Sequence, residues 1–312
     1  MSPIKKSIVC FGLTPCIQRI LEFPSVEKGR VNRAVKTTVG IGGKGANTAR
    51  MIKQLGGISL LFGFAGGANG RLLEQMLDAE DINYRHVHVS GETRICQTLV
   101  EAGNPETTEL VEEMPPVDSG EWDRLLQGVD ALNLSGAIAA LSGKLPAGAP
   151  EDGYAQLCRL VAGQGGRVIL DAPGQPLMLA LEHKPALVKI NDAELLQTTG
   201  MYHVEIAAQS LLDKGAKSVL ITSGAKQAYY VDAEQTLNIF PPKIEAVNPV
   251  GSGDAVTAGM AFALNRGKSI EEAIIEGMAC GAANALNLLS GFIRLEDVER
   301  LRNEVVLKPL GK

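Results

Sequence analysis

Short apolar runs alternate with amphipathic stretches along most of the chain. The apolar runs have the length of buried strands, and they lie at 7–13, 58–66, 131–139, 167–172, 186–190 and 217–224. The amphipathic stretches carry apolar residues at helical spacing, and they lie at 45–57, 70–80, 150–166, 205–216, 269–289 and 295–305. Strands that alternate with helices predict βαβ units, in which helices cover both faces of a mostly parallel sheet. We therefore expect an α/β fold.

Two segments break this rhythm. Residues 17–39 and 94–114 alternate apolar and polar positions, with turn signals between the runs. Each segment is typical of a small β-ribbon inserted between βα units. Together the two ribbons could form a β lid over a site on the sheet. Because no linker or repeat separates other parts, we expect residues 1–312 to form a single domain that carries this lid.

Composition narrows the classes of function. The net charge is −5, which argues against a general nucleic-acid surface, and no apolar run reaches membrane-spanning length. The five cysteines are odd in number and form no C-x-x-C pair, which disfavours a disulfide framework and a zinc knuckle. The beginning of the chain is typical of a first strand rather than a signal peptide. These features predict a cytoplasmic protein without nucleic-acid or membrane partners.

The first glycine cluster, "GIGGKGAN" at 40–47, matches the weak pattern G-x-G-x-x-G. A dinucleotide site also needs an acidic residue about 20 positions further on, and none occurs before Glu74. A dehydrogenase is therefore disfavoured, and no P-loop pattern is present. What remains is a glycine turn at a helix start, with Lys44 inside it and Asn47 one turn later. Such a turn either accepts an anion or is only a tight turn with a solvated lysine.

The second cluster lies in "NPVGSGDAVTAGMAFAL" at 248–264. The bare amides of Gly251, Ser252 and Gly253 would point beyond a helix N-terminus, where the helix dipole is positive. Such amides can stabilise negative charge on a transferring phosphoryl group. Asp254 is either a helix cap or a base for a hydroxyl nucleophile. Because a cap needs no flanking glycines, the pattern favours the base.

The two clusters together resemble the signature regions of the ribokinase-like (PfkB) carbohydrate kinases. The resemblance extends from about residue 7 to residue 310 and includes "GETR" (91–94), "VILDAPG" (168–174), "LVKINDAEL" (187–195) and "VLITSG" (219–224). "GETR" and "SGKLPAG" (142–148) are most similar to the sugar-phosphate branch, which contains 1-phosphofructokinase and tagatose-6-phosphate kinase. The resemblance implies a three-layer αβα sandwich with a small β lid, ATP as co-substrate, Mg²⁺ as cofactor and a hexose phosphate as acceptor.

The resemblance also implies roles for residues at matching positions. Asp254 would be the catalytic base, and the backbone of Gly251, Ser252 and Gly253 would form an anion hole. The sugar hydroxyls would be held by Gln18, Gly42, Gly43 and Asn47. The phosphate already on the sugar would be faced by Lys44, Arg94 and Ser142. The nucleotide would be held by Lys189, Asn191, Glu194, Thr222, Gly224 and Asn287. Glu194 would reach the metal ion through water.

The sequence departs from the family pattern at the expected sugar site. Thr14 and Gln18 stand where an N-P-x-x-D-like segment has Asn and Asp, and Cys96 replaces a common Asn. Ile190 and Gln227 replace a usual Pro and Gly near the nucleotide. These changes leave the identity of the sugar substrate open.

The alternatives to a hexose-phosphate kinase are a kinase of an unphosphorylated sugar or nucleoside and a non-catalytic sensor of sugar phosphates or nucleotides. Analogy with similar folds suggests a homodimer through the lid. His86 and His88 would share a strand face, but the sequence shows no third metal ligand near them.

Overall fold

The computed structural model describes residues 7–103 and 107–310. The larger of its two sheets has ten strands in the order β14-β13-β12-β11-β10-β9-β8-β1-β4-β5. These strands are β1 (Ser7–Gly12), β4 (Ile58–Gly66), β5 (Asn83–Val89), β8 (Ile138–Ser142), β9 (Arg167–Asp171), β10 (Leu187–Asn191), β11 (Ser218–Thr222), β12 (Ala228–Asp232), β13 (Thr236–Phe240) and β14 (Val306–Pro309). All pairs from β11 to β5 are parallel. The predicted α/β fold is confirmed.

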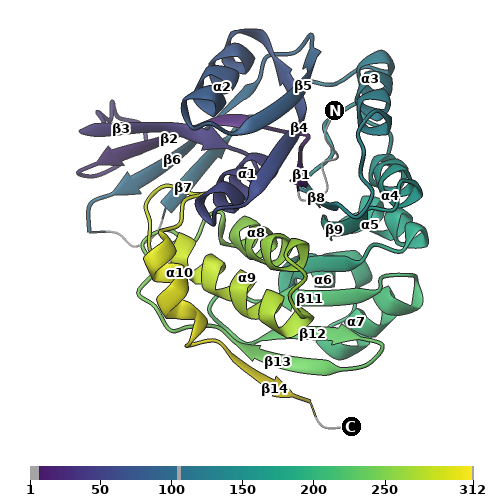
Figure 1. The fold of residues 1–312 in the computed structure, drawn as a ribbon. Helices are drawn as coiled ribbons and strands as arrows, with labels where there is room; N and C mark the ends of the chain where they lie inside the picture. Colours follow the sequence, from purple (N-terminus) through teal and green to yellow (C-terminus); the bar gives the residue numbers. More distant parts are fainter. Residues whose placement is uncertain (1–6, 104–106, 311–312) are drawn as a thin grey trace.

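Helices cover both faces of this sheet and give a three-layer sandwich (Figure 1). One face packs against α1 (Lys44–Gln54), α2 (Gly67–Ala79), α8 (Ser252–Asn265), α9 (Ile270–Ala285) and α10 (Leu295–Arg302). The other packs against α3 (Ser119–Asp130), α4 (Gly153–Gly163), α5 (Gly174–Ala180), α6 (Asp192–Thr199) and α7 (Val204–Asp213), with a short 3₁₀ turn η1 (Leu181–His183). Each face buries its own apolar cluster, because strands covered on both sides expose no residue to water. In the described part of the chain no helix is both long and apolar enough to span a membrane.

The prediction of a strand at 131–139 is wrong about where this strand begins. Residues 131–137 form turns, and β8 begins only at Ile138. Gly136 has φ = 70°, a left-handed conformation that ends regular pairing, and its amide bonds to the carbonyl of Gly165. The apolar run therefore begins in a turn, and the strand lies a few residues later.

The antiparallel edge of the sheet was not predicted. Strands β12, β13 and β14 pair antiparallel to their neighbours and continue the sheet beyond β11. The last of them comes from the C-terminal end of the described chain and pairs with β13, about 70 residues earlier in sequence. Hydrophobic periodicity detects strands but not such distant partners, so this edge was out of reach.

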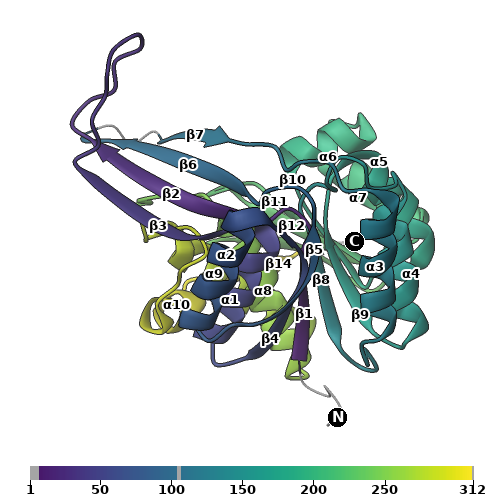
Figure 2. The same cartoon turned by 90° about the horizontal axis from the view of Figure 1, so that it is seen from above.

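The second sheet has four strands in the order β3-β2-β6-β7, and we call it the lid. The strands are β2 (Cys16–Phe23), β3 (Lys36–Gly42), β6 (Arg94–Glu101) and β7 (Thr107–Val111). They come from the two segments in which ribbons were expected, although residues 104–106 lie outside the described ranges. The two ribbons join through a parallel pairing of β2 with β6. Figure 2 shows the lid extending away from the body of the molecule.

Candidate active site

The N-terminus of α8 lies in a fixed backbone framework, in which the Ser252 amide donates to the Pro249 carbonyl at 3.1 Å and the amides of Gly251 and Gly253 have no hydrogen-bond partner among the described residues. Gly251 has φ = 82°, and a Cβ there would come within 3.1 Å of the Gly291 amide. The side chain of Asn284 fixes the turn: its Nδ2 donates to the Val250 carbonyl (2.9 Å), and its Oδ1 accepts from the Gly291 amide (2.9 Å). No side chain caps this helix. Of the three amides expected to form an anion hole, those of Gly251 and Gly253 are free and that of Ser252 is bonded to Pro249, and their role in binding phosphate stays a prediction.

Asp254 lies in the first turn of α8 and is only 5% exposed. Asn47 Nδ2 donates to its Oδ2 at 2.8 Å, which fixes the orientation of the carboxylate. Burial raises the pKa of Asp254 to about 6, although Lys44 and the Asn47 hydrogen bond oppose this rise. A carboxylate with a pKa near neutrality is a better proton acceptor than an ordinary aspartate. The burial and the raised pKa of Asp254 agree with the predicted role of general base, which stays a prediction.

Asp171 is a central residue of the site that the sequence analysis did not assign. It ends β9, it is fully buried, and it forms ion pairs with two lysines: Lys189 Nζ at 3.0 Å and Lys44 Nζ at 3.3 Å. Burial raises the pKa of Asp171, but the two ammonium groups outweigh that effect and hold the pKa below its ordinary value. Its place at the carboxyl end of a buried parallel strand, inside "VILDAPG", was the signal that could have identified it.

The two lysines connect the glycine clusters. Burial lowers the pKa of Lys44, but the carboxylates of Asp171 and Asp254 outweigh it and keep this pKa above its usual value. Lys189 is 3% exposed, and a Cβ built on Gly253 would lie 2.7 Å from its Nζ. The ammonium group of Lys189 therefore occupies the space beside the bare backbone of Gly253. Positive charge and uncovered amides meet at one place, which suits a phosphoryl group.

The residues expected to face the sugar phosphate lie around the turn at Thr14. Arg94 Nη2 donates to the Thr14 carbonyl at 3.0 Å, and Nη1 donates to the Glu112 carbonyl at 3.0 Å. A Cβ on Gly43 would lie 3.1 Å from the same Thr14 oxygen, and Lys44 follows directly. The side chain of Lys44 also packs near Gly143, so it lies beside the end of β8. Arg94 thus contacts the Thr14 loop directly, whereas Lys44 follows a glycine that packs on this loop and directs its side chain toward Gly143 and Asp171.

Several polar atoms near this loop are buried without a hydrogen-bond partner among the described residues. They are Ser142 Oγ, Arg94 Nε and Asn47 Oδ1. An unpaired buried polar group costs about 1–3 kcal/mol, so such atoms are rare unless a ligand satisfies them. Three of them among the predicted substrate residues mark this end of the site as a place for a polar ligand.

Gln18 and Gly42 lie on neighbouring lid strands. Gln18 is 6% exposed, and its Nε2 donates to Thr98 Oγ1 at 2.7 Å. A Cβ on Gly42 would lie 2.7 Å from Cys16 Sγ and 3.3 Å from Gln18 Oε1. The amide of Gln18 is therefore held in place by Thr98 rather than free to rotate. It provides an uncharged polar group where the family pattern has a carboxylate.

The residues expected at the nucleotide have structural partners of their own. Asn191 and Glu194 form a capping box at the start of α6, in which Asn191 Oδ1 accepts from the Glu194 amide (2.8 Å) and Glu194 Oε2 accepts from the Asn191 amide (3.2 Å). Thr222 ends β11 in register with Asn191, and Gly224 follows with φ = 56°. Asn287 lies just past the end of α9, where its Nδ2 donates to the Ala283 carbonyl at 2.8 Å. Their contact with a nucleotide stays a prediction.

The described residues contain no group of three His, Cys, Asp or Glu side chains placed to hold a metal ion. His86 and His88 lie on β5, where His86 Nδ1 is 3.1 Å and His88 Nε2 is 3.7 Å from Glu74 Oε1. Mg²⁺ usually takes only one or two protein carboxylates and fills its other positions with water and substrate phosphates. Glu194 in the first turn of α6 and Asp254 in the first turn of α8 are carboxylates of this kind, and the nucleotide would bring the metal ion with it.

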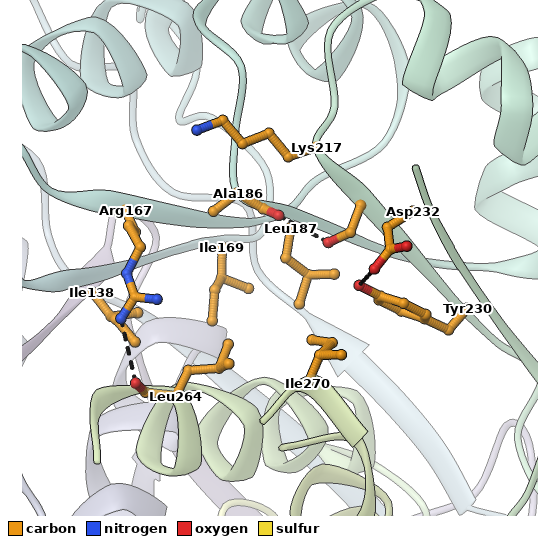
Figure 3. A pocket seen from close by; sticks show the side chains of 11 residues that line it. Ile138, Arg167, Ile169, Ala186, Leu187, Lys217, Tyr230, Asp232, Leu264 and Ile270 are labelled. Carbon is orange, nitrogen blue, oxygen red and sulfur yellow. Dashed lines mark hydrogen bonds between the residues drawn. The ribbon is translucent and has the colours of Figure 1, made fainter. Parts of the chain in front are cut away.

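A well-formed cavity lies at the opposite edge of the sheet (Figure 3). It measures about 220 Å³ and is lined by the first residues of four parallel strands, Ile138, Arg167, Leu187 and Ser218. Three pairs already involve its polar side chains: Arg167 with the Leu264 carbonyl, Tyr230 with Asp232 and Ser218 with the Ala186 carbonyl. Open α/β sheets bind ligands at the carboxyl ends of their strands, so this cavity is not the candidate active site.

Comparison with known families decides the class of protein. Residues 5–292 match the model of the pfkB family of carbohydrate kinases. The chain belongs to this family. The buried aspartate at a glycine-rich helix start is therefore part of a sugar kinase, a phosphotransferase whose acceptor is an alcohol.

Solved structures with the same fold cover nearly the whole chain. A candidate phosphofructokinase of Staphylococcus aureus is 30% identical, with 97% of this chain and 99% of that chain covered and a TM-score of 0.82. Phosphofructokinase-2 of Escherichia coli in complex with fructose-6-phosphate is 29% identical, with 95% and 98% covered and a TM-score of 0.87. The ribokinase of Thermotoga maritima is 21% identical, with 95% and 98% covered and a TM-score of 0.75, which shows the shared ribokinase-like fold.

The close approach of Lys189 to Gly253 can be tested directly. Gly253→Ala places a methyl group where the ammonium group of Lys189 lies, and Asp171 prevents that group from moving away freely. We expect kcat to fall roughly 10²–10³-fold, the range for loss of one anion-hole contact. Gly163→Ala is the matched control, since an added Cβ there meets nothing within 4 Å. Near-normal turnover by a folded Gly253→Ala enzyme would show that this contact has no part in the reaction.

Proposed function

We propose that the protein is an ATP-dependent kinase that phosphorylates a hydroxyl of a hexose phosphate. The observation that carries the proposal is the cationic and unsatisfied sugar end of the site, where Arg94 binds the Thr14 carbonyl, Lys44 lies beside Gly143 and Ser142 Oγ is buried without a partner among the described residues. A neutral sugar needs no such cations. The phosphofructokinases with similar structures support an acceptor that is already phosphorylated.

The acceptor phosphate would complete contacts that the chain leaves open. Arg94 keeps its Nε unpaired while its other two nitrogens each donate to a carbonyl oxygen, so the guanidinium is fixed and still has N–H donors to offer. A planar guanidinium that is held in place loses little entropy when it binds phosphate. Ser142 Oγ and the ammonium group of Lys44 would provide further donors from β8 and α1.

Catalysis follows from the position of Asp254. Its carboxylate, oriented by Asn47, would accept the proton of the acceptor hydroxyl as that oxygen attacks the γ-phosphate. The free amides of Gly251 and Gly253 and the ammonium group of Lys189 would stabilise the charge on the transferring group. The lid would exclude water, which is a competing acceptor. Each of these contributions comes from residues that the fold brings together at one end of the sheet.

ATP would lie along the carboxyl ends of β10 and β11, near Asn191, Thr222 and Gly224. Mg²⁺ bound with the nucleotide would neutralise phosphate charge during transfer. Glu194 uses one carboxylate oxygen in its capping box, so it would face the metal ion through water. Glu194 would thus be one of the few protein carboxylates near Mg²⁺, and water and the nucleotide phosphates would fill the other positions of the ion.

Two other functions are tested by the same experiment. A kinase of unphosphorylated sugars or nucleosides is favoured only by the neutral Gln18, and a non-catalytic sensor would not need the raised pKa of Asp254. ADP release should be measured with fructose 1-phosphate, fructose 6-phosphate and tagatose 6-phosphate, and with their unphosphorylated parents. We expect turnover only with phosphorylated acceptors, and Asp254→Asn provides the background rate.

The role of Arg94 gives the decisive variant in this panel. Arg94→Ala removes a charge-assisted contact worth about 1.5–3 kcal/mol, so kcat/KM for the sugar phosphate should fall roughly ten- to a hundred-fold while the KM for ATP is unchanged. The matched control is Arg159→Ala on α4, where the arginine is exposed on the body of the molecule outside the lid. A wild type that prefers a neutral sugar, or an Arg94→Ala enzyme with undiminished kcat/KM, would contradict the proposal.

We propose in addition that the lid joins two copies of the chain. Val39 and Leu110 are 47% and 51% exposed, and strand pairing through Gln97 places both on the lid face turned away from Gln18. In the loop between β2 and β3, Val31 and Val35 are even more exposed. Apolar side chains gathered on an extended sheet favour a partner surface, and a second copy offers a matching one.

Light scattering would test the assembly. The wild type should have the mass of at least a dimer, and Val39→Lys combined with Leu110→Lys should give monomers because two buried charges would be introduced at the interface. Ile58→Lys is the control, since Ile58 is 59% exposed at the start of β4 in the body of the molecule. A monomeric wild type, or a double variant of unchanged mass, would refute the lid interface.

A further inference from the structure

A buried asparagine on α9, Asn284, bonds to two loops that lie beside the candidate reaction centre. Its side chain has no exposed surface, and its neighbours along the helix are the buried alanines Ala282, Ala283 and Ala285. Burying an amide costs free energy unless hydrogen bonds satisfy its polar atoms, so packing alone would favour an apolar side chain here. The partners of the amide therefore indicate what it does.

The donor end of Asn284 holds the turn that precedes α8. Its Nδ2 donates to the Val250 carbonyl at 2.9 Å and to Ser252 Oγ at 3.3 Å. These two residues flank Gly251, and the free amide of Gly253 follows directly after them. Asn284 thus sets the direction of the amides that would face a transferring phosphoryl group.

The acceptor end of Asn284 holds the loop at 288–291. Its Oδ1 accepts from the Gly291 amide at 2.9 Å. A second buried asparagine, Asn248, fixes the other end of this loop, because its Nδ2 donates to the Leu288 carbonyl at 2.8 Å. The loop is therefore tied at both ends to buried amides, and its position depends on them.

Gly291 transmits this constraint to the residue that orients the predicted base. A Cβ built on Gly291 would lie 2.5 Å from Oδ1 and 2.8 Å from Cγ of Asn47, so the Gly291 backbone packs against that amide. Asn47 Oδ1 has no hydrogen-bond partner among the described residues, so packing has to prevent rotation of the amide. Its Nδ2 donates to Asp254 Oδ2 at 2.8 Å. The hold of Asn284 on Gly291 thus extends to the carboxylate of Asp254.

We propose that Asn284 is a positioning residue that aligns the free amides at the start of α8 with the carboxylate of Asp254. The amides would act on the transferring phosphoryl group and the carboxylate on the attacking hydroxyl, so the two have to be aligned with one another. A misplacement of about 1 Å in such an arrangement can cost roughly 10²-fold in rate. The inference rests on the proposed function, because it assigns Asn284 to phosphoryl transfer at that site.

The first test is Asn284→Ala, which removes all three hydrogen bonds and leaves the side chains predicted to contact sugar phosphate and nucleotide unaltered. We expect kcat to fall roughly 10²-fold, while the KM values for fructose 6-phosphate and ATP stay within about threefold of the wild type. Gln164→Ala is the matched control. The Gln164 amide also joins two backbone groups, the Leu134 amide at 3.2 Å and the Val129 carbonyl at 3.3 Å, but at the C-terminal end of α4. This control should lose thermal stability and keep its kcat.

The second test is Gly291→Ala, which places a methyl group against the Asn47 amide and should displace its hydrogen bond to Asp254. Burial raises the pKa of Asp254, and the Asn47 hydrogen bond opposes that rise. Loss of this bond should therefore raise the pKa further and move the acidic limb of kcat/KM to higher pH. The charged groups that also act on Asp254 are unaltered in this variant: Lys44, Asp171 and Lys189.

Gly200→Ala is the matched control for backbone strain in the second test. Gly200 has φ = 70°, against 69° at Gly291, but an added Cβ there meets nothing within 4 Å. Its acidic limb should coincide with that of the wild type. A shift of equal size in both glycine variants would show that strain, and not the Asn47 contact, is the cause, and would overturn this arm of the proposal.

A folded Asn284→Ala enzyme with kcat within about threefold of the wild type, or with raised KM values in place of a lowered kcat, would overturn the proposal. If Asn284→Ala does not fold, Gly291→Ala decides: an unchanged kcat and an unchanged acidic limb would contradict the proposal. If the wild type phosphorylates no hexose phosphate, the proposed function fails, and the same comparisons are made with the acceptor that does release ADP. A wild type without turnover on any acceptor would overturn both.

Discussion

The site depends on one buried carboxylate that is shared by two lysines. Asp171 has no exposed surface, and burying a lone charge in this way would cost several kcal/mol. The Nζ atoms of Lys44 and Lys189 lie 3.3 and 3.0 Å from its carboxylate oxygens and offset that cost. The two lysines come from different elements, α1 and β10. Each lysine is consequently held beside a glycine-rich helix start. Lys44 begins α1, and Lys189 lies against Gly253 at the start of α8.

Strand register brings these charges to one edge. Ser142 pairs with Asp171 across β8 and β9, and Asn191 pairs with Thr222 across β10 and β11. The parallel strands therefore end together, and their last side chains form a row that faces the N-terminus of α8. Asp254 completes this row from the helix side, and its burial raises its pKa to about 6. The same low-polarity surroundings that strengthen the lysine pairs thus also produce a carboxylate able to accept a proton near neutral pH.

Local sequence features predicted what depends on local chemistry. The alternation of strands and helices, the glycines around Asp254 and the lid segments all have short-range signals, and the α/β fold and the kinase family are confirmed. Features that depend on distant contacts were not predicted: Asp171 shows its importance only through lysines 127 and 18 positions away, and β14 pairs with a strand that no periodicity marked. Gly136 explains the misplaced strand, because an apolar run gives no sign of a left-handed turn inside it. The individual roles assigned to the substrate and nucleotide residues remain predictions.

The most direct test of this account is the pH dependence of kcat/KM in the wild type and in Asp171→Asn. Activity should fall as Asp254 is protonated, with an acidic limb at about pH 6 in the wild type. The Asp171 charge raises the pKa of Asp254, while Lys44 and Lys189 lower it. Asp171→Asn removes the first effect and leaves both ammonium groups beside Asp254, so the limb should move to lower pH. The plateau should fall at least roughly tenfold because the two lysines lose the charge-assisted contacts with the carboxylate that they share. The titration of the sugar phosphate is common to both enzymes and cancels in the comparison. An acidic limb and plateau that are the same in both enzymes would contradict the central role of the shared carboxylate.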